Sequence, residues 1–130
     1  MTEASVTQAL LATFKARLPG DRVVLKTCDR FTKGIPDIYI ADPHTWLEVK
    51  LLRRGDYLAS CSDALQQLTM RRLWQQTKGR AWYVVYAVPS PREKHVSIYR
   101  PGELTKALWD YTAEGFNHAA VADFVLKGTA

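Results

Sequence analysis

The sequence has few cysteines and no long apolar run. Its two cysteines, Cys28 and Cys61, have neither the spacing of a metal site nor a secretory context. We therefore expect free thiols in a reducing, cytoplasmic compartment. No apolar stretch approaches the roughly 20 residues of a membrane span, and the N-terminus has no signal-peptide pattern. Internal repeats, low-complexity tracts and linkers are also missing. These absences argue against a disulfide scaffold, a membrane protein and a repeat protein.

What is present indicates one soluble globular domain with a basic surplus. The chain has 130 residues, of which 47% are hydrophobic and 24% charged, which is enough for a single core. We expect a core over residues 1–100 and a helical tail over residues 101–130. The net charge of +5 favours a polyanionic partner.

The most informative stretch is GIPDIYIADPHTWLEVK, residues 34–50. Residues 38–41 and 46–50 are rich in β-branched and aromatic side chains, and the segment between them favours a turn. A four-residue loop pairs Ala41 with Trp46, and side chains then alternate between the two faces of the hairpin. One face is wholly apolar and consists of Ile38, Ile40, Leu47 and Val49.

The opposite face of this hairpin collects Asp37, Tyr39, Glu48 and Lys50. In this register Asp37 faces Lys50 and Tyr39 faces Glu48, so the two acids lie on a diagonal, with Cβ atoms roughly 7 Å apart. Two such carboxylates can share a divalent cation, and hard oxygen ligands suit Mg²⁺ or Mn²⁺. The cation can polarise a phosphodiester and lower the pKa of a bound water, which Lys50 can orient. The competing interpretation is a cross-strand salt bridge on a solvated face.

The residues of this hairpin resemble a known signature. Pro36-Asp37, followed after ten residues by Glu48-Val49-Lys50, is similar to the motif of the PD-(D/E)XK nucleases. The preceding Gly34-Ile35 makes the stretch resemble the VRR-NUC branch and the archaeal-type Holliday junction resolvases. In element order the resemblance covers residues 1–88. It implies an α/β fold with a restriction-endonuclease-like core, in the order α-β-β-β-α-β, with a mixed sheet flanked by helices.

The resemblance also implies an activity and a set of roles. It implies a metal-dependent DNA endonuclease, with branched or flap DNA as substrate and no organic cofactor. Asp37 and Glu48 would bind Mg²⁺ or Mn²⁺ together with the backbone carbonyl of Val49, and Lys50 would position the attacking water. The rival interpretations are a non-catalytic DNA- or protein-binding module on the same fold and a restriction-type endonuclease.

Two predicted helices contribute further candidates. The first covers residues 2–18 and has Glu3 at the centre of its apolar stripe. This acid either complements the helix dipole or, as the resemblance implies, reaches the metal. The second runs over residues 62–78, from an N-cap at Ser62. The resemblance implies a glutamine of this helix in the site. Gln66 lies near the middle of the apolar face, and Gln67, to one side, is the alternative.

Basic and aromatic residues around the hairpin are candidate DNA contacts, with charge for phosphates and a ring for base stacking. The competing interpretation is that they are simply solvated. The candidates are Arg30, Lys33, Arg53, Arg54, Tyr57 and Arg71.

The remaining elements complete the expected fold. We expect strands at 22–27 and 81–88, the latter parallel to 46–52 through a right-handed crossover, and a last, edge strand at 95–99. Two tail helices are expected near 102–114 and 117–127. The tail is rich in aromatic residues, which either form a homodimer interface or fold back to complete the core of a monomer. They are Trp109, Tyr111, Phe116 and Phe124.

Overall fold

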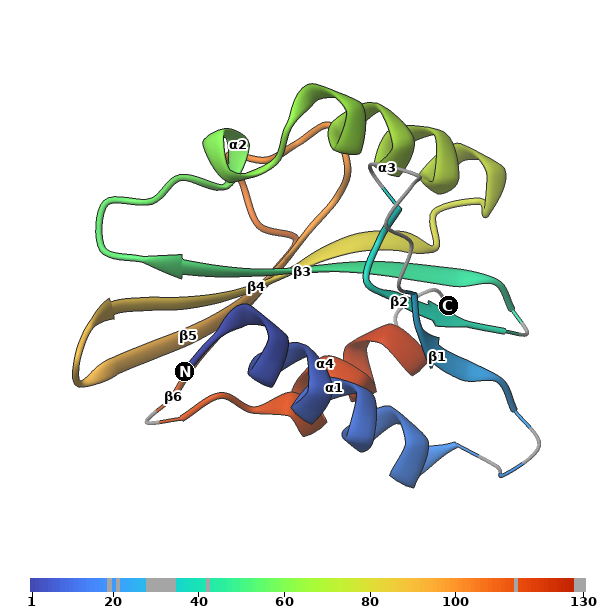
Figure 1. The fold of residues 1–130 in the computed structure, drawn as a ribbon, viewed down its shortest axis with the longest axis horizontal. Helices are drawn as coiled ribbons and strands as arrows, with labels where there is room; N and C mark the ends of the chain where they lie inside the picture. Colours follow the sequence, from blue (N-terminus) through green and yellow to red (C-terminus); the bar gives the residue numbers. More distant parts are fainter. Residues whose placement is uncertain (19, 21, 28–34, 42, 114, 128–130) are drawn as a thin grey trace.

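The computed structural model describes residues 1–18, 20, 22–27, 35–41, 43–113 and 115–127. They form a six-stranded sheet in the order β1-β2-β3-β4-β5-β6, with helices on both faces (Figure 1). The strands are β1 (Val24–Lys26), β2 (Ile38–Ile40), β3 (Thr45–Arg53), β4 (Ala81–Ser90), β5 (Glu93–Tyr99) and β6 (Trp109–Ala113). The helices are α1 (Glu3–Arg17), α2 (Leu58–Cys61), α3 (Ala64–Gln76) and α4 (His118–Lys127). Within the described part of the chain, every helix is too short or too polar to cross a membrane.

The predicted α/β class and element order are confirmed. β1, β2 and β3 form an antiparallel meander, and β4 runs parallel to β3 after the helical crossover. β5 then pairs antiparallel with β4, and β6 pairs antiparallel with β5. The one addition within the predicted core order is the short helix α2 between β3 and α3.

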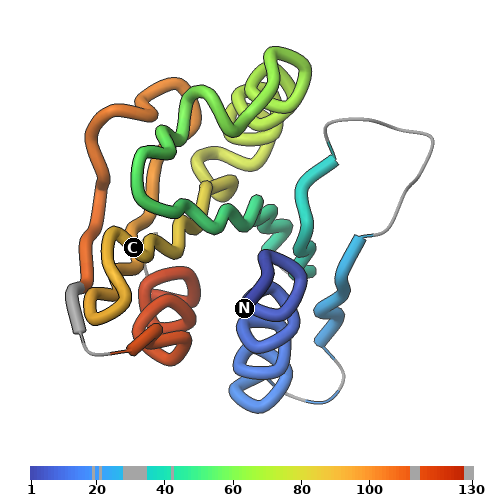
Figure 2. The backbone as a smooth tube through the Cα atoms, turned by 60° about the vertical axis from the view of Figure 1, so that its left-hand side comes forward, coloured from blue at the N-terminus to red at the C-terminus, as the bar shows by residue number. Residues whose placement is uncertain are grey.

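Helix α1 forms because its first turn is capped and its apolar residues recur every four positions. The Thr2 hydroxyl accepts a hydrogen bond from the Ser5 N–H, and the Ser5 hydroxyl accepts one from the Thr2 N–H. The two bonds satisfy backbone groups that the helix leaves open. Val6, Leu10 and Phe14 are buried. They pack on the lower face of the sheet beside α4 (Figure 2).

The two faces of the sheet have separate cores. α1 and α4 cover a large cluster that includes Phe14, Leu47 and Val84, whereas α3 covers a smaller one around Met70 and Tyr83. β4 supplies both clusters and is buried on both faces over its first six residues, as its continuous apolar run predicts. Truncating one of these large side chains to alanine costs about 2–5 kcal/mol.

The register of the β2–β3 hairpin differs by two residues from the predicted one. The observed pairs are Ile38 with Leu47, Tyr39 with Trp46 and Ile40 with Thr45, so the loop covers 41–44. Thr45 joins the strand because its buried hydroxyl donates to the Pro43 carbonyl at 3.0 Å and accepts from Arg80 Nε at 2.8 Å. A shift of two residues leaves every side chain on its predicted face.

The predicted helix over residues 102–114 is wrong, and so is the predicted edge position of the strand at 95–99. The turn after β5, with Gly102 at a φ of +89°, sends the chain back along that strand. β6 then pairs Trp109 with Ile98 and Tyr111 with Val96. Trp109 and Tyr111 are two residues apart and so lie on the same face of the strand. Their rings stack, with centroids 5.9 Å apart. The predicted final helix is confirmed as α4.

The tail folds back onto the sheet. Trp109, Phe116 and Phe124 pack against the larger core cluster, as the monomer alternative expects. Tyr111 remains 36% exposed and Leu108 is 52% exposed, so part of the apolar surface stays open at β6.

Candidate active site

Asp37 and Glu48 lie where β2 and β3 separate. The last described β2 pair is Ile38 with Leu47, and the next position on each strand carries one of the two acids. Asp37 Oδ2 accepts a hydrogen bond from the Val49 backbone N–H at 2.9 Å. The corrected register thus places the carboxylates directly opposite each other, closer than the predicted diagonal.

The two carboxylate oxygens of Glu48 differ in their hydrogen-bond partners. Its Oε2 atom accepts a 2.6 Å hydrogen bond from Gln66 Nε2 and forms a 3.3 Å ion pair with Lys50 Nζ. Its Oε1 atom is buried and has no hydrogen-bond partner among the described residues. A buried carboxylate oxygen without a donor is costly, so this atom marks a place where a positive group fits.

Burial, followed by the nearby charge of Asp37, raises the pKa of Glu48 from an ordinary 4.5 to about 8. The Lys50 ammonium opposes this shift without cancelling it. Burial and the Asp37 charge thus favour the protonated form of Glu48. A divalent cation between the two carboxylates would reverse the balance and favour both charged forms.

Gln66 is held in its orientation by two buried hydroxyl groups. The Ser62 hydroxyl donates to Gln66 Oε1 at 2.8 Å and lies 3.0 Å from the Tyr83 hydroxyl. Because serine has one hydroxyl proton, Tyr83 must donate to Ser62. The chain of bonds presents the Gln66 amide nitrogen to Glu48.

Sequence reasoning did not find this role for Ser62 or Tyr83. The predicted N-cap at Ser62 is wrong. Asp63 caps α3 by accepting from the Gln66 N–H at 2.8 Å, which frees the Ser62 hydroxyl for the amide. The available signal was the spacing, because Ser62 precedes Gln66 by four residues, about one helical turn. Tyr83 gave no signal within its apolar strand.

Gln67 points elsewhere. Its Nε2 atom donates to the backbone carbonyls of Ser62 at 2.8 Å and Ala59 at 3.2 Å. It therefore ties α3 to α2. Of the two glutamines that the sequence left open, the structure brings Gln66 to the carboxylates.

The donor set fits Mg²⁺ or Mn²⁺. Asp37 and Glu48 supply hard oxygen ligands, and the orphaned Glu48 Oε1 provides a free one. The carbonyl of Val49 points to the same side of β3 as its N–H, as in any extended strand, and this is the side of Asp37. Mg²⁺ is commonly bound by one or two carboxylates and keeps several waters.

Glu3 lies farther along β3. Its Oε2 atom accepts from the Leu51 N–H at 3.2 Å, two residues beyond Val49, whose N–H Asp37 engages on the same side of the strand. No group of three acidic, histidine or cysteine side chains with metal-binding geometry occurs in the described ranges. In the structure Glu3 thus bonds to the backbone of β3 beside the pair and is not grouped with Asp37 and Glu48.

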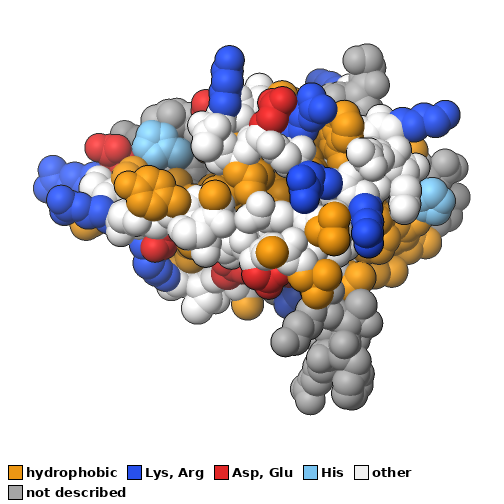
Figure 3. All heavy atoms as spheres, turned by 90° about the horizontal axis from the view of Figure 1, so that it is seen from above, with side chains coloured by type: hydrophobic (Ala, Val, Ile, Leu, Met, Phe, Trp, Pro, Cys, Tyr) orange, Lys and Arg blue, Asp and Glu red, His pale blue; other side chains and the backbone are white. Residues whose placement is uncertain are grey.

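Three of the candidate DNA contacts, Arg53, Arg54 and Tyr57, lie at or just after the end of β3. Arg53 donates from Nη2 to the Met1 carbonyl at 2.9 Å, Arg54 is exposed, and Tyr57 is 75% exposed. Arg53 and Arg54 line a groove of about 280 Å³ with residues 88–91. Arg71 is exposed on α3, on the face where Figure 3 shows several Lys and Arg side chains. Arg30 and Lys33 lie outside the described residues.

No family model and no curated protein sequence matches the chain. Among solved structures, the chain is similar to Hjc, a Holliday junction resolvase of Archaeoglobus fulgidus. The identity is 14% and the TM-score is 0.48, over 92% of this chain and 99% of that one. Because the likeness is this distant, the function must be argued from the geometry of the site.

Proposed function

We propose that the protein is a metal-dependent DNA endonuclease that hydrolyses a phosphodiester at the Asp37–Glu48 pair. The observation that supports this most is the buried Glu48 Oε1, which has no donor among the described residues although a second carboxylate lies opposite. With both acids charged, a purely structural salt bridge with Lys50 would leave that oxygen without a donor and the two carboxylates in repulsion. A divalent cation resolves both problems at once.

Each residue then has a task. Asp37, Glu48 and the Val49 carbonyl would hold Mg²⁺ or Mn²⁺, which when bound polarises the scissile phosphate and lowers the pKa of a water. Gln66 fixes Glu48 Oε2, so that Oε1 is free for the cation. Lys50, held at 3.3 Å from Glu48, would orient the attacking water and stabilise the negative charge that develops on the phosphate.

The substrate proposal rests on charge, surface and the sequence resemblance. The net charge is +5, and the groove of Arg53 and Arg54 follows directly on the strand that carries Glu48. Tyr57, in the next turn, offers an exposed ring for stacking on a base. The resemblance of residues 34–50 to junction-resolving and flap-cutting nucleases favours branched DNA.

We also propose a homodimer, because symmetric cleavage of two strands needs two sites related by a twofold axis. The open surface at β6 supports this. It includes a groove of about 430 Å³ lined by Trp109, Tyr111 and Phe124, beside a strand with no neighbour on its outer side in the described sheet.

The proposal is tested by cleavage of four labelled DNAs, namely a four-way junction, a flap, a duplex and a single strand. Each is incubated with Mg²⁺, Mn²⁺ or EDTA. We expect metal-dependent cutting that is fastest on a branched DNA. Full activity in EDTA would disprove the metal role, and no cleavage of any DNA with either metal would disprove the nuclease.

A further inference from the structure

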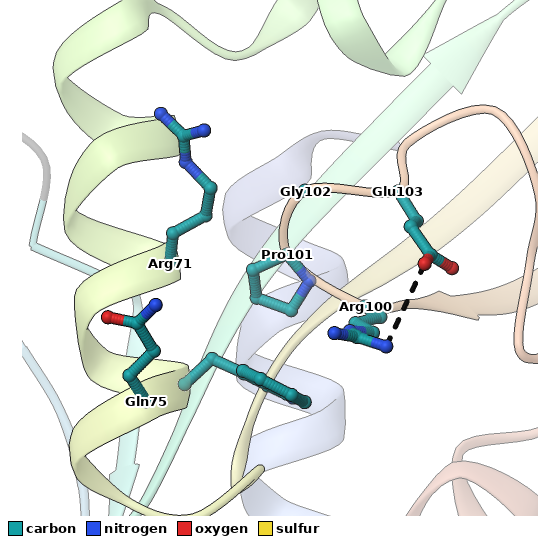
Figure 4. Close-up of a pocket in the computed structure, with 7 residues that line it drawn as sticks. Arg71, Gln75, Arg100, Pro101, Gly102 and Glu103 are labelled. Atoms are coloured by element: carbon teal, nitrogen blue, oxygen red, sulfur yellow. Dashed lines mark ion pairs between the residues drawn. The ribbon is translucent and has the colours of Figure 1, made fainter.

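A second polar pocket lies on the flank of α3 away from the carboxylates. Arg71, Trp74 and Gln75 of α3 line one side, and residues 100–103, in the turn after β5, line the other (Figure 4). Its volume is about 230 Å³. Arg71 follows Gln66 by five residues, about 140° around the helix. The pocket is therefore separate from the site that Gln66 enters.

Arg100 is fixed at the wall of this pocket. Its guanidinium group lies over the Trp74 ring, 4.2 Å from the ring centroid, and its Nη1 atom is 3.7 Å from Glu103 Oε1. A guanidinium group stacked on an indole is held in one plane and is partly desolvated. Its outer nitrogens are therefore presented in a fixed direction at little further entropic cost.

Arg71 approaches the same pocket from the helix. Its aliphatic stem runs along the turn, because a Cβ atom on Gly102 would lie 3.5 Å from Arg71 Cδ. A side chain at Gly102 would meet Arg71 only at ordinary van der Waals distance, so it is the left-handed φ that favours glycine in this turn. Arg71 and Arg100 thus line one pocket from separate elements, against the single carboxylate of Glu103, whose side chain is 58% exposed.

We propose that this pocket binds a phosphate group of the DNA, at a contact outside the cleavage site. Arg100, held over Trp74, presents a planar guanidinium group that can bind phosphate oxygens through paired hydrogen bonds, and Arg71 adds a second positive charge at the same pocket. The Gln75 amide supplies a further donor at the rim. This inference rests on the proposed function for the identity of the ligand, since free phosphate has the same chemistry.

The first test measures DNA binding in EDTA for the wild type, Arg71→Gln, Arg100→Gln and the control Arg72→Gln. Arg72 is the exposed neighbour on α3 and does not line the pocket, so its variant removes the same charge. We expect about tenfold weaker binding for each pocket variant. The slope of log affinity against log salt should fall by about one unit. Arg72→Gln should change affinity by less than about twofold. An equal loss of DNA affinity in all three variants would overturn the proposal that this pocket binds a phosphate group.

The second test does not depend on DNA. Inorganic phosphate is titrated into the isotope-labelled protein while the indole N–H resonance of Trp74 is followed, with chloride at equal ionic strength as the reference. A saturable shift in the wild type that Arg100→Gln abolishes supports a phosphate site. A response equal to that of chloride overturns it. If the wild type neither binds nor cuts DNA, the proposed function fails, and this titration still decides the pocket.

Discussion

Gln66 Nε2 lies 2.6 Å from Glu48 Oε2 and joins the first turn of α3 to the centre of β3. This bond decides which oxygen of Glu48 remains free. Oε2 also carries the Lys50 ion pair, so all of the donors found for this carboxylate converge on one atom. The geometry of the proposed metal site therefore depends on a helix residue that does not itself bind the metal.

The two glutamines of α3 should respond differently to truncation. Gln66→Ala removes the bond to Glu48 and should lower the cleavage rate about tenfold or more, the usual effect of losing a group that orients a metal ligand. Gln67→Ala removes only bonds to the carbonyls of Ala59 and Ser62 and is the matched control. Single-turnover kinetics at saturating Mg²⁺ measure both, and equal losses would show that Gln66 has no special role.

The hydroxyl groups behind Gln66 should show a graded effect on stability and metal affinity. Ser62→Ala leaves the Gln66 oxygen and the Tyr83 hydroxyl without a partner in a buried place, which should cost about 1–3 kcal/mol. Tyr83→Phe removes its own hydroxyl and should cost less, because Ser62 still donates to Gln66. Denaturant unfolding and Mn²⁺ titration of both variants test this order. A larger loss in Tyr83→Phe than in Ser62→Ala would contradict the hydrogen-bond directions.

The metal-free protein should lose stability as the pH rises from about 4.5 to about 8. The pKa of Glu48 is raised to about 8 by burial and by Asp37, so within this window the folded state holds a proton that the unfolded state has released. Stability is thus greatest below the lower value and falls towards the upper one. Thermal unfolding in EDTA should show this fall in the wild type relative to Glu48→Gln, which cannot ionise there. Parallel pH profiles for the two proteins would refute the shift.

Much of the site could be predicted because a shift in register by two residues does not change which face of the sheet a side chain lies on. The sequence predicts the loop at 42–45 and the structure has it at 41–44, yet Asp37 and Glu48 still share a face because side chains alternate with period two. The two-residue shift itself could not be predicted. It depends on Thr45, whose hydroxyl is bound by Arg80 from the start of β4.

The strand β6 in the tail could not be predicted from local sequence either, because it depends on a neighbouring strand. Trp109 and Tyr111 are two residues apart, the spacing of side chains on one face of a strand, but so short a stretch becomes a strand only by pairing with the neighbouring β5. Likewise, the pocket between Arg71 and Arg100 joins residues from a helix and a turn. No local pattern in the sequence connects them.

The exposed edge of β6 is the surface through which we expect two copies of the chain to form the homodimer. If two copies join there, Tyr111→Glu should disrupt the interface by placing a charge in it, whereas Tyr57→Glu, at another exposed tyrosine, should not change the mass. Light scattering at concentrations well above those needed for activity gives the answer. A monomeric mass for the wild type would exclude the dimer, and a dimer that survives Tyr111→Glu would move its interface elsewhere.

The central claim is that Asp37 and Glu48 together hold one divalent cation, and calorimetric titration with Mn²⁺ at pH 8 tests it most directly. We predict one Mn²⁺ per chain for the wild type and for the control Glu93→Gln, whose carboxylate lies on the exposed end of β5. Asp37→Asn and Glu48→Gln should each weaken the binding at least about tenfold while the thermal unfolding remains cooperative. Undiminished Mn²⁺ binding by the Asp37→Asn/Glu48→Gln double variant would contradict the account.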